Sequence, residues 1–302
     1  MASMTIRELD PERDVEQAVA LLVATNPTVV TNAAEWLHRR ASFPERARVF
    51  SRVAEVDGRI AGQVGAGLNF FGSGDLGFIS VHVHPDHRNH GIGRALYELA
   101  FEHVLSLAVP RATSLFDETK AGVEFAQRRG WREVRAEILS ILDPREVDEQ
   151  PAGSVELVPA RDLDPRELHR IDEEATRDMP AVEETKAIPY NEWLSFVWND
   201  PLFTRDGSFG AVVDGHVAAV SLLIANLDIG RAVHMFTGTS REHRGRGLAL
   251  AVKLASTNWA AANGITQIVT TNDENNAPML AVNRRLGYHP SGRRVEYLRD
   301  LS

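Results

Sequence analysis

Two glycine-rich segments of the chain contain the residue types that bind a phosphate group. Residues 88–93 read Arg-Asn-His-Gly-Ile-Gly, and residues 244–249 read Arg-Gly-Arg-Gly-Leu-Ala. Glycine lets the backbone approach a ligand closely, free N–H groups at the start of a helix attract phosphate, and arginine adds charge-assisted hydrogen bonds. The pattern predicts two sites for a pyrophosphate-bearing cofactor. The expected binding residues are Val83, Arg88, Asn89, His90, Gly91, Ile92, Gly93, Thr239, Arg244, Gly245, Arg246, Gly247, Leu248 and Ala249.

Each segment stands between an apolar, strand-like run and an amphipathic helix. Before the first segment, Ile79, Val81 and Val83 alternate with polar residues, which is the period of a strand. After the second, Leu248 and Val252 begin an apolar stripe with helical spacing. A single tight strand-to-helix turn can share this pattern, but two copies at corresponding places argue against chance.

Other phosphate-binding loops match less well. A P-loop requires a Lys-Ser/Thr pair after its second glycine, which neither segment has. A dinucleotide fingerprint requires a third small residue where Leu96 and Leu250 stand. A dinucleotide-dependent oxidoreductase is therefore disfavoured.

The landmarks of the first half recur in the second. The turn Asp57-Gly58 returns as Asp214-Gly215, Arg88 returns as Arg244, and Gly130 returns as Gly287, all at nearly one offset. The polar, proline-containing segment 144–154 interrupts the hydrophobic pattern. We therefore expect domains over residues 1–143 and 155–302, joined by a linker over 144–154.

The loops resemble those of the GNAT superfamily of N-acetyltransferases, whose motif is Arg/Gln-x-x-Gly-x-Gly/Ala, often preceded by Val-x-Pro. Val83 and Pro85 match that prefix. The last helix of the family carries Asn-x-x-Ala-x-x-x-Tyr-x-x-x-Gly-Phe, and in the second half Asn276 and Gly287 fall on this frame. The resemblance implies an α/β fold of two tandem GNAT-like domains, each a mixed, mainly antiparallel sheet flanked by helices. It also implies acetyl-CoA as acyl donor and Asn276 as a contact of its pantetheine arm.

Acetyl transfer to an amine requires a base, and the leaving thiolate requires a proton or a hydrogen-bond donor. His234 and Asp228 lie on or near the strand before the second loop and are the candidates for the base. Asn283 stands where the family often has its tyrosine donor, and it can hydrogen-bond to sulfur without acting as an acid. The first half has Ala126 there. The second half is therefore the expected site of the chemistry.

The first half offers Asp75, His82 and His84 as alternative bases. With His87 and His90, the histidines form a dense cluster, but no further ligand is placed to complete a metal shell. We expect no metal.

Composition narrows the class of partner. The net charge of −9 disfavours nucleic acid, no apolar run approaches the length of a membrane span, and the absence of cysteine excludes disulfides. We expect a cytoplasmic N-acetyltransferase that uses acetyl-CoA and a small-molecule amine. The alternative is a CoA-binding scaffold or sensor in which one or both domains are inactive.

Overall fold

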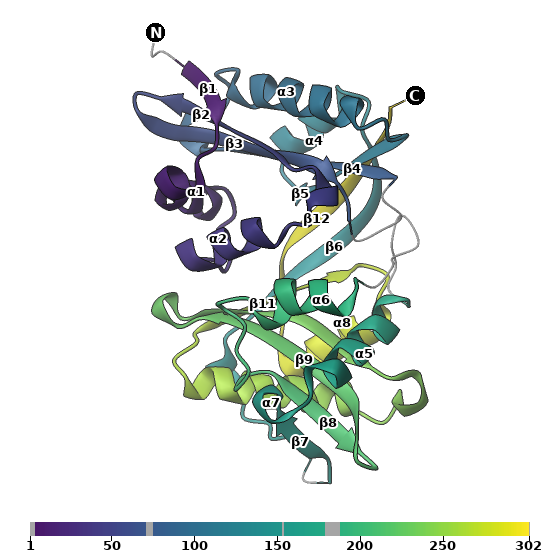
Figure 1. Ribbon diagram of the computed structural model, residues 1–302. Coiled ribbons are helices and arrows are strands. Elements are labelled where there is room, and N and C mark those ends of the chain that lie inside the picture. Colours follow the sequence, from purple (N-terminus) through teal and green to yellow (C-terminus); the bar gives the residue numbers. More distant parts are fainter. Residues whose placement is uncertain (1–3, 71–74, 153, 179–187, 302) are drawn as a thin grey trace. The chain divides into compact units, whose positions relative to one another are not determined.

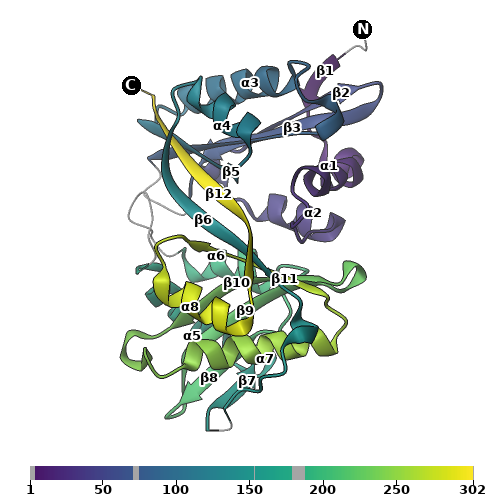
Figure 2. The ribbon, with the colours of Figure 1, turned by 180° about the vertical axis from the view of Figure 1, so that it is seen from behind.

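The computed structural model describes residues 4–70, 75–152, 154–178 and 188–301 (Figures 1 and 2). The chain divides into two compact units. Unit 1 comprises residues 1–136 and 294–302, and unit 2 comprises residues 137–293.

Unit 1 is built on a mixed sheet in which only β4 and β5 run parallel, while the other described pairs are antiparallel. Two helices cover each face of this sheet, α1 and α2 on one and α3 and α4 on the other (Figure 1). The elements are β1 (Met4–Glu8), α1 (Pro11–Thr25), α2 (Ala33–Ser42), β2 (Phe50–Val56), β3 (Arg59–Leu68), β4 (Leu76–Val83), α3 (Ile92–Ser106), β5 (Arg111–Asp117), α4 (Lys120–Gln127) and the end of β12 (His289–Asp300).

Unit 2 repeats this arrangement, with β10 and β11 as its parallel pair. Helices α5 and α6 cover one face of its sheet, and α7 and α8 cover the other (Figures 1 and 2). The elements are the end of β6 (Arg132–Leu142), β7 (Glu156–Pro159), α5 (Pro165–Thr176), α6 (Tyr190–Trp193), β8 (Phe209–Val213), β9 (His216–Asn226), β10 (Arg231–Thr239), α7 (Leu248–Ala262), β11 (Gln267–Asp273) and α8 (Ala277–Leu286). The predicted mixed α/β fold and its duplication are confirmed.

Each unit is completed by a strand from the opposite half of the sequence. Residues 294–300 of β12 pair with β5, and Val295 and Tyr297 are buried in the core of unit 1. Residues 137–142 of β6 pair with β11 in unit 2. The boundaries of the two compact units therefore differ from those of the two sequence halves. Strands β6 and β12 each contribute residues to both units. The boundary at 144–154 remains a prediction about the duplication.

The predicted hairpin turns have the backbone that their sequence demands. Asp57 and Gly58 have φ of 50° and 77°, and Asp214 and Gly215 have φ of 51° and 81°. Two consecutive residues with positive φ define a type I′ turn, for which Asp-Gly is a preferred sequence. These turns set the register of β2 with β3 and of β8 with β9.

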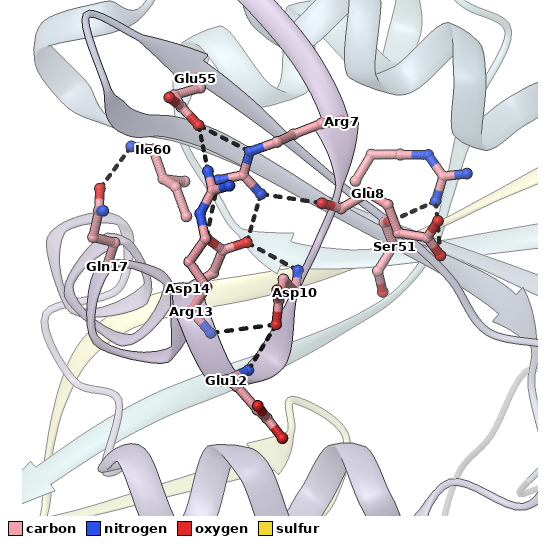
Figure 3. A network of polar contacts seen from close by, with 11 residues as sticks. Arg7, Glu8, Asp10, Glu12, Arg13, Asp14, Gln17, Ser51, Glu55 and Ile60 are labelled. Atoms are coloured by element: carbon pink, nitrogen blue, oxygen red, sulfur yellow. Dashed lines mark hydrogen bonds and ion pairs between the residues drawn. The ribbon is translucent and has the colours of Figure 1, made fainter.

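A network of ion pairs fixes the start of unit 1 (Figure 3). Arg7 on β1 donates to both carboxylate oxygens of the buried Asp14 on α1, at 2.6 and 2.9 Å, and to Glu55 on β2 at 2.8 Å. Burial alone would raise the pKa of Asp14, but the hydrogen bonds from Arg7 and the Asp10 N–H, together with the charges of Arg7 and Arg13, lower it overall. The network ties α1 to the sheet, and the last residue of α1, Thr25, contacts His82 on β4 at 3.1 Å.

Within the described segments, no helix is both long and apolar enough to cross a membrane.

Candidate active site

The two glycine-rich loops have the same backbone. Asn89 and Gly91 in the first loop, and Gly245 and Gly247 in the second, all have positive φ between 64° and 86°. Gly91 and Gly247 stand at the N-cap positions of α3 and α7, where no side chain caps the helix. A Cβ atom added at Gly91 or Gly247 would meet no atom within 4 Å. Both loops therefore present uncapped helix N–H groups to open space, as a phosphate cradle requires.

The arginines of the two loops differ in their electrostatic surroundings. Arg88 Nε donates to the carbonyl of Val83 at 3.2 Å, and Arg244 Nε donates to the carbonyl of Thr239 at 3.3 Å. Arg244 also pairs with Asp178 at 2.5 Å, whereas Arg88 has no ion pair with the residues that the structure describes.

Asp178 also forms an ion pair with a second arginine, Arg241, which lies three residues before Arg244. Arg241 donates to it at 2.5 Å, and the two guanidinium groups together lower the pKa of Asp178. Glu174, on the preceding helix α5, accepts from the backbone N–H of Arg241 at 2.6 Å. A phosphate at the second loop would compete with these carboxylates for positive charge.

In each unit the two parallel strands separate to form a fork. Strand β4 pairs with β5 only from Leu76 to Phe78, and β10 pairs with β11 only from Arg231 to Val233. Beyond these points each strand continues its ladder with its antiparallel neighbour. Backbone groups that face a fork are available to an extended ligand, which can add to the strand edge by hydrogen bonding.

A β-bulge distinguishes the fork of unit 2. The register of β10 against β9 shifts between His234 and Phe236, which leaves Met235 as an inserted residue. The described pairing of β4 with β3 has no such shift. Bulges commonly re-aim backbone groups next to active sites. Counted from the Asp-Gly turns, His234 occupies the register position that Ile79 has in unit 1, because it faces Leu223 where Ile79 faces Ala66.

Four buried polar residues gather behind the fork of unit 2, and we call them the polar quartet: His234 on β10, Lys253 on α7, Asn283 on α8 and Tyr288. His234 Nδ1 and the Tyr288 hydroxyl are hydrogen-bonded at 2.6 Å. Lys253 Nζ donates to Asn283 Oδ1 at 2.7 Å and lies 4.9 Å from the centre of the Tyr288 ring. The quartet therefore consists of two hydrogen-bonded pairs, which the cation–π contact of Lys253 with the Tyr288 ring joins into one cluster.

Burial controls the ionisation of the quartet. It lowers the pKa of His234 well below the usual range, and the nearby Lys253 adds to this shift. It lowers the pKa of Lys253 to about 7 and raises that of Tyr288. His234 is therefore neutral near pH 7, and its Nε2 is buried without a hydrogen-bond partner among the described residues. An unpartnered buried nitrogen is costly, and such groups concentrate at functional sites.

The matching positions of unit 1 lack this polarity. Ile79, Tyr97, Ala126 and Trp131 stand there, all buried. Trp131 Nε1 and Arg299 donate to the Tyr97 hydroxyl at 3.0 and 2.9 Å. The Tyr97 hydroxyl is thus already engaged in hydrogen bonds within the fold. The other three residues, Ile79, Ala126 and Trp131, are buried and form what we call the apolar floor of the unit 1 fork.

The structure brings together two of the three predicted catalytic residues. His234 and Asn283 both belong to the polar quartet. Asp228 lies exposed in the turn Leu227–Ile229, at the end of β10 opposite the second loop, and does not join them. The sequence analysis missed Lys253, although a signal was present: it is the only charged residue in α7, an otherwise largely apolar helix.

Asn276 and Thr119 act as helix caps. Asn276 accepts from the N–H of Met279 at 3.3 Å, and Thr119 accepts from Gly122 at 3.1 Å. Capping accounts for both side chains, and contact of Asn276 with the pantetheine arm remains a prediction.

The two histidines that are alternative bases in unit 1 make hydrogen bonds within the fold. His82 contacts the hydroxyls of Thr25 and Ser80 at 3.1 and 3.0 Å, and burial lowers its pKa to about 4. His84 accepts a hydrogen bond from the N–H of Asp86. Asp75 directly precedes the first residue of β4, at the end of the strand opposite the first loop. Over the described ranges, no group of three or more His, Asp or Glu residues is arranged to hold a metal ion.

A glycine-rich loop at a helix start, beside a fork between parallel strands, is the arrangement expected of a site for an extended, phosphate-bearing ligand. The profile of the Acetyltransferase (GNAT) family matches residues 16–131 and 167–288. The chain therefore belongs to the GNAT family and is an N-acetyltransferase with two tandem GNAT regions.

Several known proteins are similar to the chain along much of its length. A mycothiol acetyltransferase from Saccharomonospora viridis is 28% identical over 232 residues, which cover 71% of this chain and 72% of that protein. The structure of a tandem GNAT protein from the clavulanic acid biosynthesis pathway has a TM-score of 0.76 at 22% identity, with 99% of both chains covered. A GCN5-related N-acetyltransferase from Sphaerobacter thermophilus has a TM-score of 0.71 at 19% identity, with 98% and 95% covered. The two solved structures establish the shared fold.

Proposed function

We propose that this protein transfers an acetyl group from acetyl-CoA to a small-molecule amine, and that unit 2 carries out the transfer. The polar quartet behind the fork of unit 2 supports this assignment most strongly. The corresponding positions of unit 1 hold apolar side chains or a tyrosine already occupied by other donors.

In unit 2, the second loop and the fork would bind different parts of acetyl-CoA. The second loop would hold the pyrophosphate on the N–H groups that follow Gly247, and Arg244 would add charge. The fork would accept the extended arm of the donor as an added strand, next to the bulge at Met235. Bound in this way, acetyl-CoA supplies an activated thioester.

His234 is our candidate for receiving the proton of the amine. It is neutral near pH 7, and Nε2 is not engaged by any described residue. Its low pKa means that it holds a proton only weakly, so it would pass the proton on rather than retain it. Asn283 would donate a hydrogen bond to the departing sulfur.

The intact loop and apolar floor of unit 1 favour a second role there, namely binding of acetyl-CoA without turnover. Its loop has the full Val-x-Pro prefix, and Arg88 is not paired with a described carboxylate. The similarity to a mycothiol acetyltransferase supports a small-molecule acceptor, and the net charge of −9 is compatible with a cationic one.

The test is release of CoA thiol from acetyl-CoA with a panel of amines. We expect turnover with at least one small amine. Replacing His234 with the residue that unit 1 uses, His234→Ile, should lower kcat by about 100-fold, and the matched variant Ile79→Val should leave it unchanged. CoA binding without turnover across the panel would support the scaffold alternative, and an unaffected His234→Ile enzyme would remove the chemistry from unit 2.

A further inference from the structure

Lys253 is a buried amine that has no ion pair with a carboxylate in the part of the chain that the structure describes. Its ammonium group lies in the core of unit 2, and its hydrogen bond goes to the neutral oxygen of Asn283. Burial is the physical cause of its lowered pKa, with no carboxylate contributing. Buried lysines are normally paired, so an unpaired one indicates a site that receives an anion at some step.

The lysine also fixes which way the Asn283 carboxamide points. An ammonium group only donates hydrogen bonds, so Oδ1 of Asn283 must face Lys253. Nδ2 then points away and donates to Asn272 Oδ1 at 2.6 Å. An amide nitrogen carries two hydrogens, and the second is not used by any residue in the described part of the chain. Asn283 is therefore held as a donor with one hydrogen to spare.

We propose that Lys253 is a positioning residue for the leaving group: it orients Asn283 to donate to the departing CoA thiolate, and its positive charge stabilises that thiolate. The inference rests on the proposed function, because it requires acetyl-CoA at the second loop. The thiolate supplies the negative charge that the buried ammonium group lacks in the free enzyme.

The electrons and protons of this step balance without a further reactant. The amine lone pair forms the new C–N bond, and the C–S bond breaks with its electron pair on sulfur. The proton released by the amine nitrogen passes through His234 to water. Lys253 keeps its proton while the thiolate is present, and the thiolate is protonated by water when CoA leaves.

Unit 1 provides an internal comparison. Tyr97 holds the position of Lys253 on α3, and Ala126 holds that of Asn283. Neither side chain carries a positive charge, and the guanidinium group of Arg299 is already bound to the Tyr97 hydroxyl, so we expect weaker stabilisation of a CoA thiolate in unit 1.

The test compares CoA with desulfo-CoA, which lacks the sulfur. Binding is measured by calorimetry near pH 7, where Lys253 is still partly protonated in the free enzyme. The Gly91→Val background limits binding to the second loop. Lys253→Met is the test variant and Tyr97→Phe the matched control. We expect Lys253→Met to reduce the preference for CoA over desulfo-CoA by about 10-fold or more, with desulfo-CoA affinity and the control unchanged. The ultraviolet absorbance of bound thiolate should disappear in the same variant.

A second variant and steady-state kinetics test the same proposal independently. Asn283→Asp gives Lys253 a permanent partner and should abolish the preference for CoA. With a working acceptor, Lys253→Met should lower kcat and leave KM for acetyl-CoA unchanged. An unchanged preference for CoA, or a loss confined to KM, would overturn the inference alone. If desulfo-CoA and CoA both fail to bind the background protein, the assignment of unit 2 as the transferase site is wrong as well.

Discussion

Replacing Lys253 with methionine should change how the stability of the protein depends on pH. Burial lowers the pKa of Lys253 from 10.5 to about 7 in the folded state. Between these values the unfolded chain binds a proton that the folded chain does not, so the free energy of unfolding rises with pH. The slope from this one group approaches about 1.4 kcal/mol per pH unit, with a ceiling of about 5 kcal/mol over the whole range.

Methionine fills a similar volume without a charge. The variant should lose the slope, and at pH 7 it should be more stable than wild type. The gain is the avoided cost of burying the ammonium group, less about 1–3 kcal/mol for leaving Asn283 Oδ1 without its donor. A net gain of about 2 kcal/mol would raise the Tm by about 4–8 °C.

The assay is urea unfolding at a series of pH values, followed by the fluorescence of the unit 2 tryptophans Trp193, Trp198 and Trp259. Lys120→Met on α4 is the control, because it removes a lysine that is exposed instead of buried. Equal pH dependence in wild type and Lys253→Met would refute the reasoning that Lys253 is an uncompensated buried charge.

Three further predictions concern the loops and metal. Gly91→Val should weaken CoA binding at the first loop, because a side chain at the helix start occupies the phosphate position; calorimetry with the second loop disabled measures this, and unchanged affinity would contradict it. Asp178→Asn should tighten CoA binding at the second loop by a few-fold, most clearly at low salt, because it removes a carboxylate that competes for Arg244; weaker binding would mean that Asp178 holds Arg244 in place for the phosphate. Activity should survive dialysis against a chelator, and stoichiometric zinc in the purified protein would contradict that expectation.

Much of the fold follows from local signals in the sequence. The Asp-Gly pairs specify their turns through positive φ, and alternation before the first loop specifies β4. The exchange of β6 and β12 between the units has no such signal. Which strand a segment joins depends on pairing between residues far apart in the chain, and no local pattern in the sequence records that pairing.

The candidate site was predictable where a motif fixes it. The loops and the frame position of Asn283 can be located by spacing alone. The bulge at Met235 could not, because one inserted residue in a strand leaves no mark in composition. The burial of Lys253 could not be predicted from the sequence, because a long side chain on a helix normally reaches solvent and only tertiary packing shows that this one does not.

The measurement that tests the central claim most directly is kcat/KM for Arg244→Ala and Arg88→Ala with one acceptor. The two arginines make the same backbone hydrogen bond in their loops, and Arg244 also forms an ion pair with Asp178, which its replacement removes as well. If unit 2 performs the transfer, Arg244→Ala should lower kcat/KM by at least about 10-fold, about 1.4 kcal/mol of transition-state stabilisation, and Arg88→Ala should cost less. The reverse ranking would contradict the account and place the active site in unit 1.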